Sequence, residues 1–203
     1  MARDTVLRRR DPTPGAGLRL ALAAQTADPE PIPAPPSDPE VVRATCDTFV
    51  LERFTAEDAW ELGHLLYARL APVAARRGQP TLVSVALAGG ATVAFQAAVG
   101  AGTTPDNEAW ARRKRAAALR FAASTWLLRC RYGPGAAGDD AFRRRAGLGP
   151  EEAAAYAIHG GAVPIRVHGV EGVVAVVVVS GLKPEEDHGV IVDVLNKHWE
   201  PVT

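Results

Sequence analysis

Lys114 is the first candidate for a functional residue, because it is a cation on the apolar side of a predicted helix. Over the segment GTTPDNEAWARRKRAAALRFAAS, a rotation of about 100° per residue puts Trp110, Lys114 and Phe121 on one stripe. Arg113 lies at the edge of that stripe. A cation turned inward needs a charged partner or a path for its stem to water. Two interpretations stay open: Lys114 pairs with a carboxylate or reaches solvent, or it contacts an anionic ligand in a pocket.

The segment HGGAVPIRV supplies a second group of candidate residues. His159 is expected to end a helix, and Gly160 and Gly161 permit either a left-handed backbone or the close approach of a ligand. The imidazole of His159 is either a ligand or proton carrier, or a group that complements the helix dipole. Arg166 follows on a predicted strand, and strand alternation leaves open whether it faces the same pocket or solvent.

The segment VSGLKPEEDHGV places an acid beside a histidine in the first turn of the last predicted helix. Asp187 and His188 suggest metal or acid–base chemistry, which makes His188 a second candidate proton carrier. Adjacent helical residues point about 100° apart, however, so the two side chains do not easily address one small site. Alternatively, Asp187 is present because negative charge is favourable at the N-terminus of a helix, where the helix dipole is positive.

Motifs of the common enzyme classes are missing from the sequence. It contains no GxGxxG after a strand, Walker loop, HExxH or GxSxG, which disfavours the usual nucleotide, protease and hydrolase chemistries. Three further histidines have no partner at metal-ligand spacing, so the metal ligands stay unassigned. These are His64, His168 and His198.

Hydrophobic periodicity and turn residues predict the elements that position these side chains. Strands are expected at about 47–54, 81–87, 91–98, 163–169 and 173–181. Helices are expected at about 55–78, 105–131, 139–145, after Pro150, and 184–198. Hairpins alternate with helices in this order, which predicts an α+β domain with a largely antiparallel sheet and helices packed on it.

Residues 1–44 are predicted to be a flexible Pro-rich extension of a domain that spans 45–203. The stretch ADPEPIPAPPSDPE has too few apolar residues to offset the entropy of ordering it. Such an arm is either an extended tether or lies along its own domain or a neighbouring subunit. Arg19 interrupts the one apolar stretch near the start, which disfavours an export signal.

Composition excludes several broad classes of partner. The 23 Lys and Arg residues balance 23 Asp and Glu residues, so no global field favours nucleic acid or an anionic membrane. The longest apolar run, GVVAVVVVSGL, is about half of a membrane span. Cys46 and Cys130 are far apart and form no CxxC pair, which argues against a disulfide framework and favours a cytoplasmic location.

The three segments together resemble the cytoplasmic, uncharacterised branch of the haem-degrading HbpS-like (GlcG-like) family. The motifs are GTTPDNEAWARRKR, HGGAVPIRVHGVEGVVAVVVVSGL and EEDH, and the likeness runs from about Phe49 to the C-terminus. It implies a central five-stranded, mainly antiparallel sheet, a homo-oligomer, and a link with haem or iron. The long N-terminus and Trp126-Leu127 depart from the usual pattern. The residues that match the motifs are Trp110, Arg113, Lys114, His159, Gly160, Gly161, Pro164, Ser180, Gly181, Asp187 and His188.

The leading hypothesis is a protein that binds haem or another small ligand, with haem-degrading activity as an extension of that role. Its pocket is expected where Lys114, His159 and Arg166 converge. An alternative is a cofactor-independent or metal-assisted enzyme for a small carboxylate metabolite, with His159 or His188 as proton carrier and Lys114 or Arg113 as anion anchor. A third possibility is an oligomeric protein-interaction module, and whether the chain is an enzyme stays open.

Overall fold

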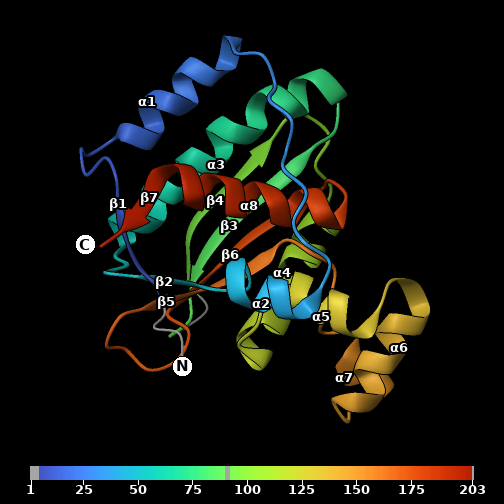
Figure 1. The fold of residues 1–203 in the computed structure, drawn as a ribbon. Helices are drawn as coiled ribbons and strands as arrows, with labels where there is room; N and C mark the ends of the chain where they lie inside the picture. Colours follow the sequence, from blue (N-terminus) through green and yellow to red (C-terminus); the bar gives the residue numbers. More distant parts are fainter. Residues whose placement is uncertain (1–4, 90–91, 203) are drawn as a thin grey trace.

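A single seven-stranded sheet organises the chain (Figure 1). This computed structural model describes residues 5–89 and 92–202. The strands are β1 (Val6–Arg9), β2 (Phe49–Leu51), β3 (Thr81–Leu87), β4 (Val93–Val99), β5 (Ala162–Val167), β6 (Ala175–Ser180) and β7 (Trp199–Pro201). The helices are α1 (Ala16–Ala23), η1 (Ala24–Thr26), α2 (Pro39–Thr45), α3 (Ala56–Arg77), α4 (Pro105–Phe121), α5 (Thr125–Tyr132), α6 (Gly135–Arg145), α7 (Pro150–Ala153) and α8 (Pro184–His198).

The sheet confirms the predicted α+β class and corrects the predicted strand number. The strands lie in the order β4-β3-β6-β5-β2-β1-β7. Strands β4, β3, β6 and β5 are antiparallel neighbours, whereas β2 runs parallel to both β5 and β1. The two additional strands, β1 and β7, have only 4 and 3 residues and pair with each other, so no periodicity marks them in the sequence. The sheet is therefore mixed and seven-stranded rather than five-stranded.

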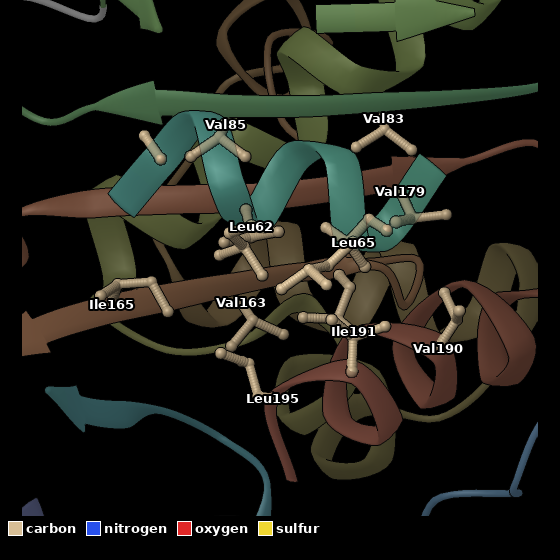
Figure 2. Close-up of a cluster of buried hydrophobic side chains, with 14 of the residues drawn as sticks. Leu62, Leu65, Val83, Val85, Val163, Ile165, Val179, Val190, Ile191 and Leu195 are labelled. Carbon is tan, nitrogen blue, oxygen red and sulfur yellow. The ribbon is translucent and has the colours of Figure 1, made fainter. Parts of the chain in front are cut away.

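The main core lies between the sheet and the two helices α3 and α8. Figure 2 shows Leu62 of α3 and Ile191 of α8 converging on Val83 and Val163, which project from the same face of the sheet. Alternate residues of the same strands point to the other face, where α4 packs Ala111 and Ala118 against Val176 and Val178. The all-Val run of β6 is buried on both faces for this reason.

Residues 5–45 pack on the domain, which agrees with the alternative that the arm lies along its own domain and not with an extended tether. Strand β1 joins the sheet, and helix α1 lies along α3 because the buried Glu61 carboxylate accepts the backbone N–H groups of Gly15 and Gly17. The Pro-rich segment then crosses α8 (Figure 1). Its carbonyls accept hydrogen bonds from Arg69, at Pro31 (2.7 Å), and from Trp126, at Pro36 (2.7 Å). These are long-range contacts, which composition does not encode.

The predicted helix over 105–131 is divided in two at Ala122. This residue ends α4 in the left-handed conformation, with φ 48°, and α5 restarts behind Ser124, whose hydroxyl accepts the Leu127 N–H. A serine two residues before an apolar run, which here begins at Trp126, is an N-cap signal that the predicted continuous helix overlooked. The predicted hairpin of β3 and β4 is confirmed, although residues 90–91 of its connection lie outside the described ranges.

No helix within 5–89 or 92–202 combines the length and apolarity needed to cross a membrane.

Candidate functional site

Lys114 forms a buried ion pair with Asp187. Its side chain is 4% exposed, and Nζ donates to Asp187 Oδ2 at 2.8 Å and to the Val179 carbonyl at 3.1 Å. Asp187 also accepts the backbone N–H of Leu182 at 3.0 Å. Burial raises the pKa of the Asp187 carboxyl, and the Lys114 ammonium opposes that shift. Of the two interpretations of Lys114, the structure shows the carboxylate pair, and the cavity described below is not lined by this residue.

The two glycines after His159 make room for the chain itself around this ion pair. A Cβ on Gly161, whose φ is 112°, would lie 2.4 Å from the Val179 carbonyl oxygen and 3.0 Å from Lys114 Nζ. A Cβ on Gly160 would lie 2.2 Å from the Pro184 carbonyl oxygen. These glycines thus allow β6 and α8, and not a ligand, to approach the backbone of this segment closely.

His159 and Trp110 form a second group, on the outer side of α4. Their rings meet edge to face with centroids 4.9 Å apart, and the Arg113 guanidinium lies 4.8 Å from the Trp110 ring centroid. Arg113 also donates to the Tyr156 carbonyl at 3.2 Å, which ties α4 to the segment that carries His159. Burial lowers the pKa of the His159 imidazole from its ordinary value of 6.5; Asp139 opposes this shift and nearby cations add to it, which favours the neutral ring at pH 7. Its Nδ1 is buried without a hydrogen-bond partner among the described residues.

These side chains line a cavity of about 380 Å³ between α4, α6 and α7. Such a volume falls in the range of small-molecule sites. Its walls include Phe142, Ile158 and several alanines, while two arginines and two aspartates, Arg113, Arg143, Asp139 and Asp140, supply charges of both signs. The arrangement offers a neutral imidazole, an aromatic face and a guanidinium to one small ligand.

His188 lies away from this cavity, in the interior. It is fully buried, stacks on Trp126 at a centroid distance of 6.1 Å, and leaves both ring nitrogens without a hydrogen-bond partner among the described residues. Burial lowers the pKa of its imidazole to about 3, although the Cys46 backbone opposes the shift. Asp187 and His188 face different neighbours, as their helical offset predicts.

Arg166 does not converge with His159, which corrects the predicted pocket. Its guanidinium lies 3.5 Å from the Ala122 carbonyl, at the C-terminal end of α4, and it lines another cavity with Val50 and His168. Trp110 stands on the same helix about 18 Å from Ala122 at the helical rise of 1.5 Å per residue. Strand alternation in β5 puts Arg166 on the face of the sheet that α4 covers. It does not determine which turn of α4 lies opposite Arg166.

Residues of α6 and α7 were not predicted as part of a site. Phe142 and Asp139 come from a segment rich in alanine and arginine, and nothing in its pattern distinguishes a cavity wall from a solvated helix. Among the described residues no group of three or more His, Cys, Asp or Glu side chains could hold a metal ion.

The fold and the cavity define the class of protein: an α+β chain with a mixed sheet, helices on both faces, and a small-molecule-sized site beside α4. The model of the family described as "Haem degrading protein HbpS-like" matches residues 54–196, and the chain belongs to this family. The Streptomyces avermitilis relative described as "UPF0303 protein" is 41% identical over 163 residues, covering 80% of this chain and 91% of that protein.

Two further comparisons agree with this assignment. A UPF0303 protein of Burkholderia mallei is 38% identical over 148 residues, covering 73% of this chain and 81% of the relative. The crystal structure of Ybr137w protein superposes with a TM-score of 0.62 at 29% identity, covering 72% of this chain and 78% of the other. The predicted family is therefore confirmed.

Proposed function

We propose that this protein binds a small, largely apolar ligand with an anionic group in the His159 cavity. The observation that carries the proposal is the buried, unpartnered Nδ1 of the half-buried His159 imidazole, which lies between Trp110 and a cavity of about 380 Å³. A buried polar atom without a partner requires an explanation, and an absent ligand is one of the recognised ones. The Arg113 guanidinium would pair with the anionic group.

Haem is the ligand that the family description suggests, and the residues present fit it in chemical type. A neutral histidine nitrogen is the usual protein ligand of haem iron, and guanidinium groups pair with carboxylates such as the propionates. His159 would hold the iron, Arg113 a propionate, and Trp110 and Phe142 the ring. The iron would supply redox chemistry, whereas these side chains would bind, orient and exclude water.

Titration of the full chain with haemin tests this proposal. We expect a saturable shift of the Soret band, which His159→Ala abolishes and Trp110→Leu weakens. His168→Ala is the matched control, because His168 is exposed and distant from the cavity, and it should titrate as the wild type does. Absence of a saturable shift, or an unchanged shift in His159→Ala, would reject haem binding at this site. Lys114 variants are unsuitable, since the buried pair of Lys114 supports the fold.

The same neutral imidazole favours a second candidate, an enzyme that moves a proton on a small carboxylate metabolite. A histidine with a lowered pKa is a competent general base near neutral pH, and Arg113 would anchor the carboxylate. Deuterium uptake into a mixture of small carboxylic acids in heavy water, followed by proton NMR, tests this. Uptake that persists in His159→Ala would exclude His159 as the base.

The homo-oligomer implied by the family resemblance is part of the proposal. Static light scattering of the full chain tests it, and a monomer at every concentration would contradict it.

A further inference from the structure

A second cavity, of about 350 Å³, lies where β1, β7 and the first turn of α3 meet. Figure 1 draws β1 and β7 on the opposite side of the view from α6 and α7, and the two cavities share no lining residue. The second cavity is rich in charged groups. They are Arg8, Arg9, Arg10 and Arg53, and Glu52, Asp58 and Glu200.

Arg9 is the unusual member of this set, because its guanidinium is buried but incompletely bonded. Its side chain is 7% exposed, and Nη2 donates to the Pro12 carbonyl at 2.7 Å. Nε and Nη1 are buried without a hydrogen-bond partner among residues 5–89 and 92–202. The nearest carboxylate oxygen, Asp58 Oδ1, lies 3.8 Å from Nη1, beyond hydrogen-bond distance. A buried cation with two free nitrogens is costly unless something else bonds to it.

Two of the three carboxylates of the cavity, Asp58 and Glu200, are bonded to other groups. Asp58 Oδ2 accepts both the backbone N–H and the hydroxyl of Thr55, each at 2.9 Å, in the capping box of α3. Glu200 is shared by Arg8 and Arg10, each at 3.2 Å. The four arginines exceed the three carboxylates by one positive charge. The N-terminus of α3 adds the positive end of a 22-residue helix to the same place.

We propose that this cavity is an oxyanion site, in which the free Nη1 of Arg9 donates to the phosphate or carboxylate group of a small molecule. Nη1 carries two N–H groups and part of a full positive charge, which suits such anions. Trp199 and Leu7 supply an apolar wall for an organic body. Arg9, Arg53 and Trp199 lie outside residues 54–196, so the site belongs to the ends of this chain and is independent of the His159 cavity.

Binding of inorganic phosphate to the full chain tests the proposal, with acetate as a second probe and sodium chloride holding the ionic strength constant. Isothermal titration calorimetry should give saturation below about 10 mM, a Kd of about 1 mM, for one of the two anions. Preference for phosphate indicates a phosphorylated ligand, and preference for acetate a carboxylate. If neither anion saturates, the cavity holds water only and the proposal fails.

Substitutions of single arginines test whether the anion binds in this cavity. Arg9→Gln should weaken it at least about tenfold, because a charged hydrogen-bond donor is lost. Arg9→Lys keeps the charge but replaces the guanidinium by a shorter, compact ammonium and should fall in between. Arg53→Gln, at an exposed side chain of the same cavity, should weaken binding less and will fold even if Arg9→Gln does not. Arg145→Gln, an exposed arginine of α6, is the control for net charge.

Unchanged affinity in both Arg9→Gln and Arg53→Gln would overturn the assignment. His159→Ala should bind phosphate as the wild type does, which separates this test from the haemin titration.

Discussion

Replacement of the buried His188 by phenylalanine should remove much of the protein's sensitivity to mild acid. In the folded chain the pKa of His188 is lowered from 6.5 to about 3 by burial, so the ring stays neutral at pH 5. In the unfolded chain the same imidazole takes up a proton as the pH falls through 6.5. The unfolded state therefore binds more protons in this window, and stability is lost as the pH decreases from 6.5 toward 3.

The size of the effect follows from these two pKa values. Between pH 7.5 and pH 5.0 the unfolded imidazole changes from mostly neutral to mostly charged, which removes about 2 kcal/mol of the free energy of unfolding. Phenylalanine keeps an aromatic ring against Trp126 and cannot be protonated. The ring nitrogens of His188 form no hydrogen bond of ordinary geometry among the described residues, so the substitution removes only a weak polar contact with the Cys46 backbone.

Urea unfolding followed by tryptophan fluorescence measures this difference. The free energy of unfolding of the wild type and of His188→Phe should be compared at several pH values, because the comparison cancels the other titrating groups. Phenylalanine is larger than histidine, so overpacking should lower the free energy of unfolding by the same amount at every pH. This constant loss does not affect the pH dependence. His188→Leu serves as a second variant with a different offset and the same pH dependence. His168→Asn, at an exposed histidine, should leave the profile of the wild type unchanged.

The reasoning is refuted if the difference between wild type and His188→Phe stays constant within about 0.5 kcal/mol over this pH range. A constant difference would mean that the imidazole is protonated equally in both states.

Three further outcomes follow from buried groups. Lys114→Met should lower the free energy of unfolding by about 3–5 kcal/mol, and adding Asp187→Leu should restore part of it; equal loss in the double variant would argue against the ion pair. Gly161→Ala should cost about 2 kcal/mol or more by the same urea assay, while Gly149→Ala, with open space around it, should cost under about 1 kcal/mol. Burial raises the pKa of the Cys130 thiol to about 11, so mass spectrometry should detect little alkylation by iodoacetamide at pH 8; rapid labelling would contradict this burial.

Helices whose ends are marked by capping residues, glycine or proline could be predicted from the sequence. Helix α3 begins behind Thr55 and ends at Gly78 in the left-handed conformation, as the capping and glycine rules indicate. Helix α4 begins with Pro105 at its first position. These features are set by neighbours in the sequence, so they can be read without knowing the fold.

Features that depend on distant partners could not be predicted. The Pro-rich segment is held by Arg69 and Trp126, which lie about forty and ninety residues further along the chain. The short strand β1 exists because it pairs with β2 and β7. In the same way, Arg166 and His159 occupy neighbouring elements in the sequence but opposite ends of α4. Periodicity assigns a residue to a face, whereas position along that face is decided by packing.

The three segments that carry the family resemblance meet at the Lys114–Asp187 pair. Lys114 comes from the first, Gly161 from the second and Asp187 from the third, and the glycine is required because its Cβ would lie 2.7 Å from Asp187 Cβ. Such a motif set therefore has a structural reason that needs no ligand. Only Trp110, Arg113 and His159 among the motif residues line the cavity beside α4. It follows that relatives which keep the ion pair but replace these three side chains would share this fold and line the cavity with different chemical groups.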